Sequence, residues 1–92
     1  MSDIIKELKK ERIKDEVNIS NLIKKIYDEC LKMIRFKNRN GVTSMIYETP
    51  LIFPGFPLYE VGDVSVKLNR YLKKQGFKTT FMKPNKISIN WA

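Results

Sequence analysis

The chain has 92 residues, enough for one small domain but too few for an enzyme domain with a separate substrate domain. Hydrophobic residues make up 42% of the sequence and ten side chains are aromatic, a composition typical of globular rather than disordered proteins. Eighteen Lys or Arg residues against ten Asp or Glu give a formal net charge of +8, which favours either a polyanionic partner or a lysine-rich solvated surface.

The sequence carries no pattern for export, membrane insertion or a structural metal. Cys30 is the only cysteine and histidine is absent, so neither an intramolecular disulfide nor a four-ligand zinc site is expected. The first residues lack the apolar core of a secretory signal, and no apolar run approaches the ~20 residues that span a bilayer. We therefore expect a protein that is neither secreted nor inserted into a membrane.

Residues 1–17 form a charged segment in which Lys, Arg, Asp and Glu alternate in sign. Several opposite charges fall at helical spacing, as in Glu7 with Lys10 and Glu11 with Lys14. The pattern predicts a solvated helical arm, followed by a single domain over residues 18–92.

The first strongly amphipathic helix is predicted from residue 19 to about residue 39. Asn18 or Ser20 could cap it if it restarts after the arm, and Asn40-Gly41 would end it. Its apolar stripe repeats every three or four residues and comprises Ile19, Leu22, Ile23, Ile26, Cys30, Met33 and Ile34.

A strand and a proline-rich loop follow this helix. Residues 43–48 favour β-structure and alternate weakly, which predicts a strand. Pro50, Pro54 and Pro57 then exclude both a helix and a central strand. Because the segment also carries Phe53 and Phe56, we interpret it as an ordered loop rather than a polar linker.

A second helix is predicted to begin between Leu58 and Asp63. Gly76 would close it, and its polarity suits the helix dipole, with acids at its start and lysines at its end. Its core stripe comprises Leu58, Val61, Val64, Leu68, Tyr71 and Leu72.

The C-terminal segment alternates like a β-hairpin with a turn over residues 83–86. Phe77, Phe81 and Trp91 would share the side that packs on the helices. The order of helix, strand, helix and two strands predicts an α+β fold, with a small three-stranded sheet covered by helices on one face.

Catalytic chemistry finds no support in the residue types present. Without histidine, the commonest general base and nucleophile activator are missing, and Cys30 falls within an apolar helical stripe. The acidic residues sit in lysine-rich helices or at a helix start, and no glycine-rich loop precedes a helix. We expect a non-enzymatic protein with no cofactor, no metal and no small-molecule substrate.

Two surfaces are candidates for binding. The C-terminal third carries seven basic residues and no acid from residue 64 onward, which suits either phosphate contact or an ordinary solvated face. These residues are Lys67, Arg70, Lys73, Lys74, Lys78, Lys83 and Lys86.

The other candidate is the loop from residue 51 to residue 59. If exposed, its apolar side chains would form a protein-docking surface; if folded back, they would cap the small core. The docking residues would be Leu51, Phe53, Phe56 and Tyr59.

Four segments of the chain carry a family resemblance. They are residues 46–50, 53–59, 72–77 and 84–91, which include Tyr-Glu-Thr-Pro, Gly-Phe-Pro-Leu-Tyr and Pro-Asn followed by Ile-Asn-Trp. Together they resemble a small family of uncharacterised proteins from nucleocytoplasmic large DNA viruses. The resemblance implies a viral protein, located in the virion or the infected-host cytoplasm, and it implies no catalytic residues.

These observations predict a non-enzymatic interaction module of a virion or another viral assembly. It would act through contacts with a protein partner or by self-association. The alternative is a basic nucleic-acid-associated protein that binds the phosphate backbone non-specifically through the seven basic residues.

Overall fold

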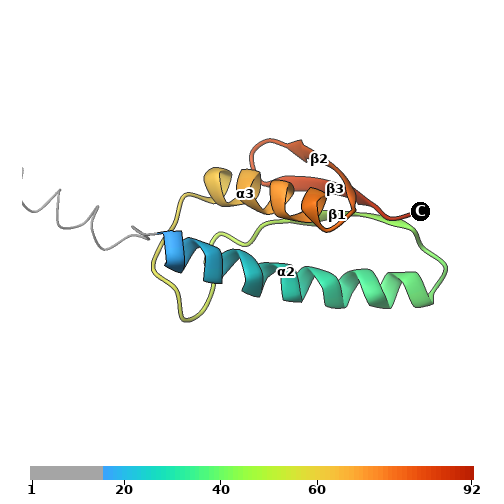
Figure 1. The fold of residues 1–92 in the computed structure, drawn as a ribbon, viewed down its shortest axis with the longest axis horizontal. Helices are drawn as coiled ribbons and strands as arrows, with labels where there is room; N and C mark the ends of the chain where they lie inside the picture. The colour runs from blue at the N-terminus through green and yellow to red at the C-terminus, as the bar shows by residue number, and fades with distance from the viewer. Residues whose placement is uncertain (1–15) are drawn as a thin grey trace, which may run out of the picture.

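The computed structural model describes residues 16–92 as two helices and a three-stranded sheet (Figure 1). Residues 1–15, most of the predicted arm, lie outside the described residues. The elements follow the predicted order and confirm the α+β fold; they are α2 (Glu16–Arg39), β1 (Ser44–Glu48), α3 (Val61–Lys74), β2 (Lys78–Met82) and β3 (Lys86–Asn90).

The sheet is antiparallel with the strand order β1-β3-β2, so the last strand lies in the middle. The register places Tyr47 opposite Ile87, and Ile87 opposite Phe81. The inward residues of β1 and β3 are buried, whereas most of the opposite face is exposed. Both helices therefore cover the same face, as the sequence predicts.

The core lies between the two helices and this inner face of the sheet. Cys30 is fully buried there, which confirms its predicted place in the apolar stripe. The buried hydrophobic residues are Leu22, Ile23, Ile26, Cys30 and Ile34 of α2, Val64, Leu68 and Leu72 of α3, and Met45, Tyr47, Ile87 and Ile89 of the strands.

Helix α2 differs from the prediction in two places. It is already helical at Glu16, so no helix restarts at Asn18 or Ser20. Met33, predicted within the stripe, is 45% exposed, and Phe36 is 67% exposed. Ile34, the residue after Met33, is 4% exposed, so Met33 lies at the side of the buried stripe and not beyond its end.

Helix α3 begins at Val61, and this corrects the predicted place of Leu58 in its core stripe. Leu58 lies in the preceding loop and is 63% exposed. The end of the helix matches the prediction: Gly76 has a φ of +101°, and Phe77 N–H donates to the Leu72 carbonyl. These two features form the Schellman motif that a glycine permits.

The hairpin between β2 and β3 is confirmed, with three residues between the paired Met82 and Lys86. The Lys83–Pro84 peptide bond in this turn is cis. The next residue, Asn85, is 5% exposed, so the turn folds back against the body of the domain instead of projecting from it.

Candidate interaction surfaces

The proline-rich loop is closed on itself by its own side chains. The hydroxyl of Tyr59 donates a hydrogen bond to the carbonyl of Pro50, which ties the two ends of the loop together. Phe56 N–H donates to the Phe53 carbonyl, and Gly55 between them has a φ of +87°. Proline followed by such a glycine is the pattern of a type II turn. The segment is therefore an ordered loop, as predicted.

The aromatic rings of the loop face inward. Phe53, Phe56 and Tyr59 are half-buried and pack against the core. Phe53 and Phe56 meet edge to face, with ring centroids 5.8 Å apart. Burial also raises the pKa of the Tyr59 hydroxyl, in keeping with its position under the loop. These three of the four predicted docking residues hold the loop in place.

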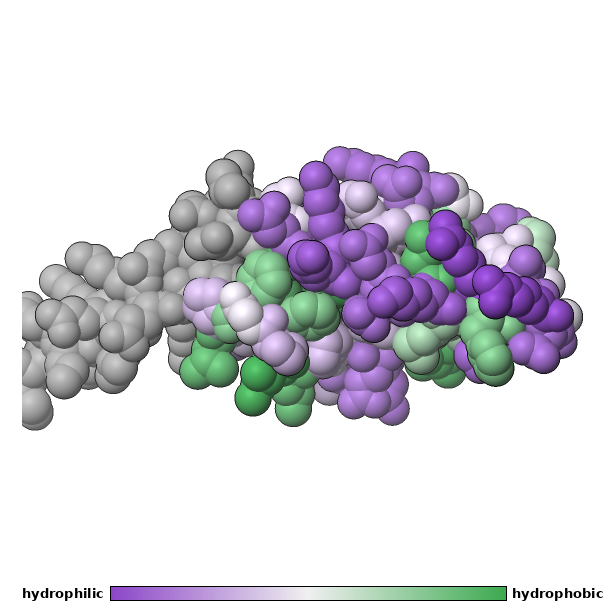
Figure 2. Space-filling view, turned by 90° about the horizontal axis from the view of Figure 1, so that it is seen from below, coloured by the Kyte–Doolittle hydropathy of each residue, from purple (hydrophilic) through white to green (hydrophobic). Residues whose placement is uncertain are grey.

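The aliphatic side chains of the loop face outward. Leu51 is 67% exposed, Ile52 66% and Leu58 63%. Leu51 was among the predicted docking residues, whereas Ile52 and Leu58 were not. Apolar side chains gather on the face seen from below, next to the start of α2 where the loop lies (Figure 2). The loop thus has an aromatic inner side that packs on the core and an aliphatic outer side that is exposed.

Three buried polar residues fix the ends of the adjoining elements. Thr49 N–H donates to the Asn85 carbonyl at 2.8 Å, and Asn85 Nδ2 donates to the Thr49 carbonyl at 2.9 Å. Ser65 Oγ lies 2.8 Å from Thr49 Oγ1 and 2.7 Å from the Val61 carbonyl. All three residues are at most 5% exposed. Their buried polar groups are paired in hydrogen bonds that join the end of β1, the hairpin turn and α3.

The seven predicted basic residues do not form one surface. Lys78 and Lys86 lie on the open face of the sheet, on the side away from the helices, and Lys83 lies in the hairpin turn. Lys73 is exposed on α3. The remaining three line a pocket between α2 and α3; they are Lys67, Arg70 and Lys74.

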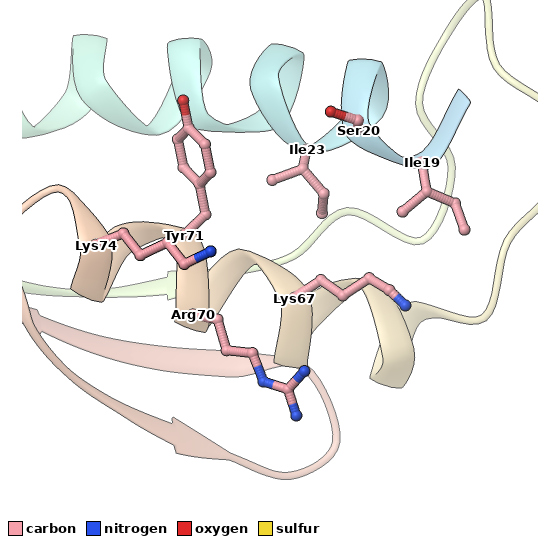
Figure 3. A pocket seen from close by; sticks show the side chains of 7 residues that line it. All are labelled: Ile19, Ser20, Ile23, Lys67, Arg70, Tyr71 and Lys74. Carbon is pink, nitrogen blue, oxygen red and sulfur yellow. The ribbon is translucent and has the colours of Figure 1, made fainter. Parts of the chain in front are cut away.

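This interhelical pocket has a volume of about 330 Å³. Its other lining residues are Ile19, Ser20 and Ile23 from α2, and Tyr71 from α3. Ile19 and Ile23 point from α2 towards α3, and Tyr71 points the other way (Figure 3). The sequence did not reveal this site, because its two walls are far apart along the chain.

Reactive groups are few in the part of the chain that the structure describes. Burial raises the pKa of the Cys30 thiol to about 12, so the thiol is protonated and inert at neutral pH. Burial likewise raises the pKa of Tyr47 to about 12. Between residues 16 and 92, no group of three His, Cys, Asp or Glu side chains could hold a metal ion. No described helix is long and apolar enough to cross a membrane.

Comparison with known proteins places the chain in a family. No curated protein and no solved structure matches it. Residues 3–75, more than half of the sequence, match the model of a protein family. The matched segment includes α2, β1, the proline-rich loop and α3. The chain therefore belongs to DUF5759, a family of unknown function.

Proposed function

We propose that this protein is a non-enzymatic interaction module that binds a protein partner through the outer side of the proline-rich loop. Leu51, Ile52 and Leu58 form the docking surface, and Phe53, Phe56 and Tyr59 support it from beneath. The single observation behind this assignment is the division of the loop into an inner aromatic side and an outer aliphatic side.

A closed loop of this kind suits binding because its shape is set before the partner arrives. Three prolines, the Phe53–Phe56 turn and the Tyr59–Pro50 hydrogen bond restrict the backbone. Docking therefore costs little additional conformational entropy. Each large aliphatic side chain that becomes fully buried contributes about 1.5–3 kcal/mol, so three can support a specific contact.

The partner would be another component of a viral assembly, such as a virion protein, or a second copy of this chain. The viral setting is supported only by the resemblance of the four sequence segments to proteins of large DNA viruses. Both kinds of partner are compatible with a small apolar surface on an ordered loop.

The test is recovery of partners by the tagged protein from its native source, with the wild type and the double variant Leu51→Ser/Leu58→Ser. Ile46→Ser is the matched control, because Ile46 is 63% exposed on the open face of the sheet. We expect the loop variant to lose the partner while its melting temperature stays near that of the wild type. Ile46→Ser should retain the partner.

Sedimentation of the purified protein separates the two kinds of partner. If the wild type self-associates and the loop variant is monomeric, the partner is a second copy. Equal partner recovery and equal self-association in the wild type and the loop variant would exclude the loop as a docking surface.

Nucleic-acid association stays the second candidate. The open sheet face, with Lys78 and Lys86, has no aromatic side chain for base stacking at any paired position. Phosphate binding would weaken steeply as salt rises, whereas apolar docking would not. Titration of the protein with an oligonucleotide at rising salt therefore distinguishes the two.

A further inference from the structure

The pocket between α2 and α3 combines an apolar floor with a cationic rim. Ile23 is 5% exposed, and Ile19 and Tyr71 are half-buried. Tyr71 is held in place by an edge-to-face contact with Tyr27, with ring centroids 4.9 Å apart. Part of the floor is accessible to solvent, because Ile19 and Tyr71 are only half-buried.

The rim carries positive charge that none of the described lining residues neutralises. Lys67, Arg70 and Lys74 are exposed, and no lining residue that the structure describes carries a carboxylate. Among the described residues the ion pair is Lys32 with Glu29, on the outer side of α2. The side chains of Lys67 and Lys74 extend along α3, while Arg70 points away from α2 (Figure 3). Three cations on one helix face repel one another, and an anionic ligand would reduce this repulsion.

The floor and the rim together define the ligand chemistry. A bare phosphate or nucleic-acid backbone would use the rim and leave the isoleucines unoccupied. The floor is mostly aliphatic, and its one ring, Tyr71, already makes an edge-to-face contact with Tyr27, so the floor lacks the successive rings on which a nucleic-acid strand stacks its bases. An acidic peptide with an apolar side chain uses both parts: the apolar group fills the floor, and flanking carboxylates meet the lysines.

We infer that this pocket binds an acidic segment of a partner protein. One leucine- or phenylalanine-sized side chain occupies the space between Ile19, Ile23 and Tyr71. Adjacent Asp or Glu carboxylates pair with Lys67 and Lys74, and Arg70 adds to the field that attracts them. The pocket is separate from the proline-rich loop and does not depend on the role proposed for that loop.

The experiment is fluorescence anisotropy with the full chain and a short labelled peptide that alternates Glu and Asp with Leu and Phe. Lys67→Gln/Lys74→Gln should weaken binding by about three- to tenfold, the effect of losing two exposed ion pairs. Lys73→Gln is the matched control, because Lys73 lies on the same helix and is exposed but does not line the pocket. It should bind as the wild type does.

Two altered peptides separate the contributions of floor and rim. Replacing Leu and Phe by Ser tests the floor, and replacing Glu and Asp by Gln tests the rim; each should bind more weakly than the parent peptide. Ile19→Ser should reduce the affinity for the parent peptide but not for its Ser version. Leu51→Ser/Leu58→Ser in the loop should leave peptide binding unchanged.

Four results would overturn the inference. They are no measurable binding of the parent peptide, equal losses for Lys73→Gln and the pocket variant, equal affinity for the Ser version, and tighter pocket-dependent binding of a single-stranded oligonucleotide than of the peptide. The last result would assign the pocket to nucleic acid instead.

Discussion

Thr49 and Asn85 bind each other twice across the end of the sheet, each donating one hydrogen bond to the backbone carbonyl of the other. The pair continues the β1–β3 ladder beyond its last register pair, Glu48 with Lys86. It also fixes the point at which the proline-rich loop leaves the sheet. The hairpin turn, although distant in sequence, therefore determines where the loop begins.

Asn85→Ala should destabilise the fold by about 1–3 kcal/mol, because it leaves the buried Thr49 carbonyl without its side-chain donor. Thr49→Val is the matched control. It keeps the backbone bonds and the shape of the side chain, and Ser65 still donates to the Val61 carbonyl. Its cost should be smaller than that of Asn85→Ala. Urea denaturation measures both, and the reverse ranking would contradict this account of the pair.

Cys30 should make the fold less stable as the solution becomes alkaline. The folded-state pKa is raised from 9.0 to about 12 because burial disfavours the thiolate. In the unfolded chain the thiol ionises at its ordinary pKa, so between pH 9.0 and about 12 unfolding releases a proton from Cys30. The stability that the buried thiol contributes is therefore fully present below pH 9.0 and is lost as the pH rises towards about 12.

The measurement is urea denaturation at about pH 8 and about pH 10, below the range in which tyrosine fully ionises. Cys30→Ala should show a smaller loss of stability between the two pH values than the wild type. In the folded wild type at neutral pH, the thiol should react slowly with a disulfide reagent. Rapid reaction without unfolding would show that Cys30 is accessible.

Phe53 should matter for stability and Leu51 should not, although both lie in the same loop. Phe53 is half-buried against the core, so Phe53→Ala should cost less than the ~3–5 kcal/mol of a fully buried phenylalanine but clearly more than Leu51→Ser. Thermal melting of the two variants compares them directly. Equal melting temperatures would mean that the ring does not support the loop.

The sequence predicts the positions of those residues that repeat with the period of a helix or a strand. Cys30, Leu68 and Leu72 all lie in the core as expected, because a buried face imposes its period on the sequence. Leu58 shows the limit of this signal. It continues the spacing of α3 backwards, yet the helix begins three residues later, and a period alone does not mark a helix start.

The loop and the pocket depend on information that periodicity does not contain. A proline-rich segment has no repeating face, so the sequence did not separate the inward Phe53 from the outward Ile52. The pocket requires Ile19 and Ile23 to meet Lys67 and Lys74, and only the packing of the two helices brings them together. The Thr49–Asn85 pair likewise depends on tertiary structure.

Deletion of residues 1–15 should leave a cooperatively folding domain. The buried hydrophobic residues that the structure describes begin at Leu22, and they form a continuous cluster with the sheet and α3. We expect one sharp thermal transition for the truncated chain, as for the full chain. Loss of cooperative melting would show that the first residues belong to the core or to an obligatory oligomer.

The two glycines Gly55 and Gly62 should respond to alanine in opposite directions. Gly55 has a φ of +87°, which alanine adopts at a cost of about 1–2 kcal/mol. A Cβ added at Gly55 would meet no atom within 4 Å, so the effect is conformational rather than steric. Gly62 lies in α3, where an added Cβ would be 3.9 Å from the Pro84 carbonyl, an ordinary contact.

Gly62→Ala should therefore stabilise the protein by up to about 1 kcal/mol, because alanine is the better helix former. Gly55→Ala should lower stability and, by changing the turn that positions Leu51 and Leu58, should weaken partner recovery by more than the loss of folded protein explains. Melting curves and partner recovery on both variants provide the test. Equal melting and equal partner recovery for Gly55→Ala and the wild type would contradict this prediction. They would mean that alanine fits the turn as readily as glycine and that the turn does not set the shape of the docking surface.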